Sequence, residues 1–240
     1  MESTNCKLSC KGCYLTEHNL EKGNFTKENL FELLDKETLL TKALYLNNLN
    51  RDINSMLNET DLVLEIQELT GNIFKENILV TDSISAGKLD GKLLKSYDFT
   101  DVLISPRTEQ SVIYSIHKLQ AEYGKCSILF TAGVDDVHIL TRAITNGINS
   151  VELNIKKPYS IADYMKYQEI NTYLMQILPD RGIEYRMNTC LEFVTSSKNC
   201  SNPENGEWEI TSILGQKDMY TCAYTSNKCI AKFIEEQNGT

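Results

Sequence analysis

Residues 101–131 read DVLISPRTEQSVIYSIHKLQAEYGKCSILFT, and their pattern decides the fold class. Two short, nearly continuous apolar runs, at 101–105 and 127–131, flank a longer amphipathic run that starts at Thr108 and stops at Gly124. Short apolar runs of this kind are typical of strands that a parallel sheet buries on both faces, and the run between them is long enough for a helix. The stretch therefore predicts a strand–helix–strand unit with parallel strands.

The same alternation continues on both sides of this unit. We expect strands at residues 43–46, 77–81, 101–105, 127–131, 150–155 and 183–188. We expect helices within residues 26–37, 53–71, 108–124, 135–147 and 160–178. This order predicts an α/β protein, either a doubly wound open sheet or a full or partial (β/α) barrel. In either architecture, ligands bind at the carboxyl ends of the strands.

The alternation ends after residue 190. Residues 190–206 are loop-like, and residues 207–224 predict a hairpin that turns near residues 215–218. We therefore expect a core at residues 1–188 and a small cysteine-rich extension at residues 189–240.

The composition narrows the function classes. The net charge of -9 argues against a protein that coats nucleic acid. No run approaches the roughly 20 apolar residues that cross a bilayer, and the polar first ten residues lack the apolar core of an export signal. We therefore expect a cytoplasmic protein with reduced thiols, rather than one whose eight cysteines form disulfides.

Three cysteines lie close together near the start of the chain, with the spacing Cys6-x3-Cys10-x2-Cys13. Three thiolates at this spacing can hold one face of a metal cluster but are one ligand short of a four-iron cube. Structural zinc is an alternative, although it usually uses pairs of CxxC motifs and no second pair exists. A redox CxxC at Cys10 and Cys13 is another, and it leaves Cys6 unexplained.

Residues 5–14, NCKLSCKGCY, resemble the CxxxCxxC-aromatic motif of the radical S-adenosylmethionine (SAM) enzymes. The resemblance implies a partial (β/α)6, TIM-like barrel in which Cys6, Cys10 and Cys13 hold a [4Fe-4S] cluster. Its open iron would bind the amino and carboxylate groups of SAM. Reductive cleavage would yield a 5′-deoxyadenosyl radical that takes a hydrogen atom from the substrate. The resemblance also implies an electron donor such as flavodoxin or ferredoxin.

The chain departs from this family pattern in two ways. Only residues 1–5 precede the motif, so we expect a truncated first strand. The family usually has Gly-Gly-Glu at the end of the second strand, where this chain has Asn47 and Asn48. Their carbonyl oxygens would accept hydrogen bonds from the SAM ammonium group, or they form an ordinary polar turn.

The resemblance suggests further SAM contacts near the strand ends. Tyr14 would contact the adenine, unless it is a core aromatic residue. Ser83 and Ser105 end the third and fourth strands of the expected barrel. Arg107 would clamp the SAM carboxylate through two hydrogen bonds, unless it is an exposed arginine at a helix entrance.

Two other polar groups follow expected strands. Asn154, Lys156 and Lys157 face either the ligand or solvent. Asp135 and Asp136 are interpreted mainly as N-caps of the next helix.

The other cysteines divide into two kinds. Cys126 stands alone at the start of a strand, and we interpret it as a buried core residue. The remaining four lie in the extension and match the full ligand count of a second [4Fe-4S] cluster or a zinc ion, unless they are unligated thiols. They resemble the auxiliary-cluster extensions of some radical SAM enzymes, and they are Cys190, Cys200, Cys222 and Cys229.

The leading hypothesis is a radical SAM enzyme with an auxiliary cluster that modifies a peptide or a small natural-product precursor. No residue is assigned a catalytic role, and we expect neither a nucleic-acid nor a membrane partner. One alternative is a glycyl-radical-enzyme activase, whose substrate is a protein glycine. The other is a non-enzymatic iron–sulfur protein for electron transfer or structure.

Overall fold

The computed structural model describes residues 43–47, 76–95, 99–156, 158, 160–187 and 207–210. All six expected strands are present, and each bound agrees with the prediction to within one residue. The strands are β1 (Ala43–Asn47), β2 (Glu76–Asp82), β3 (Asp101–Ser105), β4 (Ser127–Ala132), β5 (Ser150–Ile155), β6 (Glu184–Met187) and β7 (Glu207–Ile210).

The strands form one sheet in the order β6-β5-β4-β3-β2-β1-β7. Every neighbouring pair is parallel. From β1 to β6 the spatial order follows the chain order, so each strand pairs with the strand that follows it in the chain. Among the described strands, β6 and β7 lie at the two ends of this order, and the sheet is open. The prediction of an α/β fold with parallel strands is therefore confirmed.

Strand β7 comes from the extension but belongs to this sheet. It pairs in parallel with β1, in a register that sets Glu207 beside Ala43 and Ile210 beside Leu46. The second strand of the expected hairpin lies outside the described residues, as does the rest of the extension. The sheet thus joins a segment near the start of the chain to one near its end.

The three long helices begin where the sequence predicts. They are α7 (Glu109–Glu122), α8 (Val137–Thr145) and α9 (Ile161–Asp180), and their N-caps are Thr108, Asp136 and Ser160. Each cap side chain accepts a hydrogen bond from a backbone N–H of the first turn, which stabilises the helix start. The expected helices at residues 26–37 and 53–71 lie outside the described residues.

Two short helices between β2 and β3 were not predicted. They are α5 (Ser83–Ala86) and α6 (Gly91–Lys95). Neither is long enough to develop an amphipathic period that a sequence pattern would reveal.

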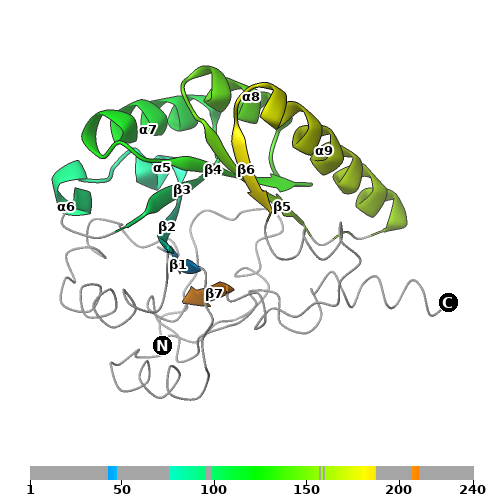
Figure 1. Cartoon of the computed structure of the whole chain (residues 1–240), viewed down its shortest axis with the longest axis horizontal. Helices are drawn as coiled ribbons and strands as arrows, with labels where there is room; N and C mark the ends of the chain where they lie inside the picture. Colours follow the sequence, from blue (N-terminus) through cyan, green and yellow to red (C-terminus); the bar gives the residue numbers. More distant parts are fainter. Residues whose placement is uncertain are drawn as a thin grey trace, which may run out of the picture.

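The main core lies between the sheet and the described helices, which form an arc along one side of the strands (Figure 1). Alternate strand residues such as Val102, Ile104 and Phe130 face these helices and are fully buried. Burying such side chains contributes roughly 1.5–3 kcal/mol each. A second, smaller apolar cluster forms around Ile78 and Leu103, with Val80 and Leu129 packed against it.

Candidate functional site

The carboxyl ends of the parallel strands meet at one edge of the sheet. The register sets Asn47 beside Val80 and Asp82 beside Ser105, so the predicted strand-end positions share this edge. We call it the carboxyl edge and define it as the segments that end or follow β2 to β5. The residues are 81–83, 105–108, 131–136 and 154–156.

Ser83 holds the neighbouring loop of the carboxyl edge. Its side chain is fully buried, and its Oγ lies 2.7 Å from Oγ of Ser111 in α7. The same Oγ accepts a hydrogen bond of 3.0 Å from the backbone N–H of Arg107. The hydroxyl therefore fixes the β3–α7 connection. Any effect of Ser83 on a ligand would be indirect, through the position of Arg107.

Asp82, which the sequence analysis did not single out, ends β2 in register with Ser105. Its Oδ1 accepts hydrogen bonds from the backbone N–H groups of Ile84 and Ser85 at 2.9 and 3.1 Å, and its Oδ2 accepts one from the Ser85 hydroxyl at 2.7 Å. The carboxylate is thus used to begin helix α5. The serine-rich stretch after a strand was a usable signal for this cap.

Arg107 has a fixed backbone and one unsatisfied side-chain donor, Nε. Ser83 holds its N–H, and the next residue, Thr108, is the N-cap of α7. Its Nε is buried and has no hydrogen-bond partner among the described residues. A buried charged donor without a partner costs at least about 1–3 kcal/mol, so the position favours an acceptor that the described residues do not supply. A carboxylate matches the fork geometry of a guanidinium.

Asp135 and Asp136 have different roles in the turn after β4. Oδ1 of Asp136 accepts a hydrogen bond of 2.8 Å from the N–H of His138, so the predicted N-cap is confirmed for Asp136. Oδ2 of Asp135 instead accepts a hydrogen bond of 2.6 Å from the N–H of Thr131 in β4. The prediction of a helix cap is therefore wrong for Asp135, because its carboxyl group closes the turn back onto the strand.

The Asp135 carboxyl group is the most strongly perturbed acid described at the carboxyl edge. Burial raises its pKa to about 7, against the opposing effects of the hydrogen bond from Thr131 and the positive charge of Arg107. Removal from water disfavours the charged form of a carboxyl group, which is the dominant effect here. A residue of this kind can change protonation state near neutral pH.

The same turn needs a glycine at position 133. Gly133 has φ +90°, in the region that L side chains rarely adopt. A Cβ there would lie 2.5 Å from Cζ of Tyr167 in α9. The glycine therefore lets α9 approach the turn that carries Asp135.

Asn154 is the next-to-last residue of β5 and Lys156 follows the strand, and both are buried. Oδ1 of Asn154 accepts a hydrogen bond of 2.8 Å from the N–H of Ile155, and its backbone carbonyl accepts one of 3.4 Å from Nδ2 of Asn171. Of the two alternatives for this group, ligand or solvent, burial excludes solvent for Asn154 and Lys156. Lys157 lies outside the described residues.

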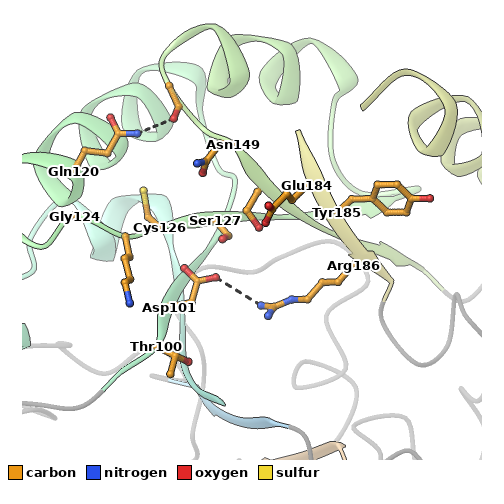
Figure 2. Close-up of a pocket in the computed structure, with 13 residues that line it drawn as sticks. Thr100, Asp101, Gln120, Gly124, Cys126, Ser127, Asn149, Glu184, Tyr185 and Arg186 are labelled. Carbon is orange, nitrogen blue, oxygen red and sulfur yellow. Dashed lines mark hydrogen bonds and ion pairs between the residues drawn. The ribbon is translucent and has the colours of Figure 1, made fainter. Parts of the chain in front are cut away.

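A second polar region lies at the opposite, amino end of the strands. A cavity of about 470 Å³ opens there beside the first residues of four strands, Asp101, Ser127, Ser150 and Glu184 (Figure 2). It also contacts the loops that precede the strands, through Gly124, Gly147 and Asn149. In α/β folds with parallel strands, ligands usually bind at the other, carboxyl end of the strands.

Arg186 connects three strands beside this cavity. Its Nε lies 2.6 Å from Oε2 of Glu152, and its Nη2 lies 3.7 Å from Oδ2 of Asp101 (Figure 2). The Glu152 side chain is only 3% exposed. The sequence analysis missed this group, although a charged residue within an apolar strand run was a usable signal.

Cys126 lines the same cavity and is buried, which confirms its interpretation as a core residue. Burial raises the pKa of its thiol to about 12, so the thiol stays protonated. Tyr14, Asn48 and the other seven cysteines lie outside the described residues. The structure therefore does not test either of the two cysteine groups as a ligand set. Within the part of the chain that the structure describes, no group of three or more His, Cys, Asp or Glu side chains could hold a metal ion.

No protein-family model matches the chain, and no curated protein matches its sequence. Of the helices that the structure describes, including α9, none is long and apolar enough to cross a bilayer.

Proposed function

We propose that this chain is a radical SAM enzyme that modifies a peptide or a small natural-product precursor. The observation that carries the proposal is the sequential order of the parallel strands from β1 to β6, downstream of Cys6, Cys10 and Cys13. A doubly wound sheet reverses its strand order at a switch point and has helices on both faces. Here the order does not reverse from β1 to β6, and the described helices share one core on one side of the strands.

The ion pairs of Arg186 support the finer proposal of a partial barrel. Between β6 and β3 lie β5 and β4, and three strand spacings amount to about 14 Å in a flat sheet. Arg186 nevertheless comes within 3.7 Å of Asp101 on the face away from the helices. A sheet that curves around this face shortens the path between the two side chains, as the wall of a barrel does.

Strand β7 lies beside β1, in the parallel orientation that the first strand of the expected barrel would have. We propose that Glu207–Ile210 takes the place of the first strand. Because the pair is parallel, Ile210 ends at the same edge as Leu46 and Asn47.

The proposed ligand set follows from the described edge and from the motif. Arg107 fits a carboxylate because its buried Nε has no hydrogen-bond partner among the described residues. It would bind the SAM carboxylate while Ser83 keeps its backbone in position. Asn47 and Asn48 would accept hydrogen bonds from the SAM ammonium group. Cys6, Cys10 and Cys13 would hold the [4Fe-4S] cluster, which when bound supplies the electron that cleaves SAM.

SAM cleavage tests this proposal directly. The anaerobically reconstituted protein, reduced in the presence of SAM, is expected to release 5′-deoxyadenosine, measured by liquid chromatography. Cys10→Ala should abolish the product, whereas the matched control Cys126→Ala should retain it, because Cys126 lies in the core. A protein with a full cluster and no product would overturn the enzyme proposal and favour the electron-transfer or structural alternative.

The second cluster is a separate proposal with its own measurement. Cys190, Cys200, Cys222 and Cys229 would complete one further [4Fe-4S] cluster, for a total of about eight irons per chain rather than about four. Cys222→Ala should lower the iron content while leaving the cluster at Cys6, Cys10 and Cys13 in place. Unchanged iron content in this variant would contradict the second cluster.

A further inference from the structure

The cavity at the amino end of the strands has the size and the lining of a binding site. We call it the amino-end cavity. Its volume is about 470 Å³, and its described lining comes from the starts of β3, β4, β5 and β6 and from the loops that precede them. Small-molecule sites usually have volumes of roughly 300–1,000 Å³. The cavity lies at the opposite end of the strands from the carboxyl edge, where the SAM site is proposed.

Three charged side chains of β3, β5 and β6 leave one negative charge beside the amino-end cavity. Nε of Arg186 donates a hydrogen bond of 2.6 Å to Oε2 of Glu152, whose side chain is 3% exposed. Nη2 of Arg186 lies 3.7 Å from Oδ2 of Asp101, which is longer than a hydrogen bond (Figure 2). One guanidinium therefore faces two carboxylates, and Asp101 is the carboxylate that is held less closely. Asp101 lines the cavity and its side chain is 18% exposed, so a ligand can reach it.

A buried hydroxyl group lies on the same side of the sheet as Asp101. Ser127, the first residue of β4, lines the cavity and is only 4% exposed. Among the residues that the structure describes, its hydroxyl has no hydrogen-bond partner. Ser127 is in register with Leu103, two residues after Asp101, so Asp101 and Ser127 face the same side. Leaving a buried polar group unpaired is unfavourable, so the position favours a ligand that supplies the missing hydrogen bond.

Two helix ends make the electrostatic potential at the cavity more negative. Helix α7 ends at Glu122 and α8 ends at Thr145, and the glycines that follow them, Gly124 and Gly147, both line the cavity. The carboxyl-terminal end of a helix carries about half a negative charge. Glu184, the first residue of β6, adds a second carboxylate to the lining. The cavity is therefore suited to a positively charged ligand.

We propose that the amino-end cavity binds a small organic cation with primary ammonium groups, which donate hydrogen bonds to the Asp101 carboxylate and the Ser127 hydroxyl. An ammonium group carries the missing positive charge, and it has three donors and no acceptor. The volume is larger than a single metal ion needs. In the described part of the chain, no group of three or more His, Cys, Asp or Glu side chains could hold such an ion. The proposal goes beyond the proposed function and needs neither SAM nor a cluster.

Lys125 is the described residue whose own ammonium group competes with such a ligand. It lines the same cavity and is exposed. No ion pair of 4.0 Å or less joins it to Asp101 or to Glu184. Lys125→Met therefore removes a competing cation, and it should leave the affinity for the ligand unchanged or raise it.

The experiment is a calorimetric titration of 1,4-diaminobutane into the full chain at pH 7 and constant ionic strength. The neutral analogue 1,4-butanediol and potassium chloride are the ligand controls, and we expect saturable binding of the diamine alone. Asp101→Asn should weaken this binding at least about tenfold, because it removes the charge and keeps the shape of the side chain. Ser127→Ala should weaken it about threefold to tenfold. Glu169→Gln removes an exposed carboxylate from α9, outside the described lining, and should bind the diamine like the wild type.

Each outcome supports the proposal or overturns it. A wild-type chain that does not bind the diamine overturns it, and binding by Lys125→Met alone assigns the cavity to the Lys125 side chain instead. Equal affinity in Asp101→Asn and Glu169→Gln places the diamine outside the cavity. Competition by potassium chloride assigns the site to an inorganic cation. If Asp101→Asn does not fold, Ser127→Ala decides whether the diamine binds in the cavity. SAM cleavage without diamine binding contradicts this inference and leaves the proposed function standing.

Discussion

Nε of Arg186 on β6 lies 2.6 Å from Oε2 of Glu152 on β5, whose side chain is 3% exposed. The two residues are directly opposite each other in the register of the parallel pair. Arg186 is about one-third exposed and extends toward Asp101 as well, so the pair sits at the border between the sheet and the cavity at its amino end.

Removing the arginine should destabilise the protein more than removing both charges. Arg186→Leu removes the 2.6 Å ion pair of the buried Glu152 carboxylate, and we expect a loss of about 2–3 kcal/mol in the free energy of unfolding. The double variant Glu152→Leu, Arg186→Leu removes that buried charge and should recover part of the loss. Urea unfolding of both variants and the wild type measures this. Equal losses would contradict the assignment of a buried, paired carboxylate.

Gly133→Ala should cost more than another glycine substitution with the same backbone geometry. Gly124 has φ +96° and no atom within 4 Å of an added Cβ, so Gly124→Ala carries only the backbone cost, about 1–2 kcal/mol. Gly133→Ala adds a clash with the Tyr167 ring and should lose about 1–3 kcal/mol more. Thermal unfolding of the two variants compares them. If the two variants have the same melting temperature, α9 does not pack tightly against the turn after β4.

Ser83→Ala should weaken both stability and SAM binding. It removes the acceptor of the Arg107 N–H and one partner of the Ser111 hydroxyl, which costs about 1–3 kcal/mol because the Arg107 N–H is left without this acceptor. Ser85→Ala is the control, since among the described residues its hydroxyl bonds only to Asp82, the N-cap of the same helix. Titration of SAM should distinguish them. Equal SAM affinity in the two variants would show that Ser83 does not position Arg107 for SAM binding.

Asp135 should make stability fall as pH rises through neutrality. In the unfolded chain its pKa is about 3.9, and in the folded chain burial raises the pKa to about 7. The folded state therefore binds more protons between these values, so stability decreases from pH 4 upward and levels off above pH 7. Asp135→Asn should be more stable than the wild type at pH 8 and gain nothing at pH 4. The result to look for in chemical unfolding is this crossover, which Asp136→Asn should lack.

The strands were predictable because their burial on both faces leaves a direct mark on the sequence. Runs such as 101–105 and 150–155 were located to the residue. The N-caps Thr108 and Ser160 were predictable for a similar reason, since a side chain that accepts a first-turn N–H acts over only three residues.

The contacts at the carboxyl edge were less predictable because they join distant segments. Position after a strand indicated that Ser83, Arg107 and Asp135 share an edge. It could not indicate that Ser83 holds the backbone of Arg107, or that Asp135 turns back to Thr131 while Asp136 caps the helix. The parallel pairing of β7 with β1 was likewise not predictable. The alternation of residues along a strand does not indicate which other strand it pairs with.

That pairing has a consequence for how the chain assembles. The ladder between Ala43–Asn47 and Glu207–Ile210 cannot form until most of the chain has been synthesised, and contacts between such distant segments slow folding. Until then β1 presents an unpaired edge, which is a template for association with other chains. Strands β1 and β7 are therefore parts of one folding unit. Neither strand is expected to keep its place in the sheet when the protein is cut between them.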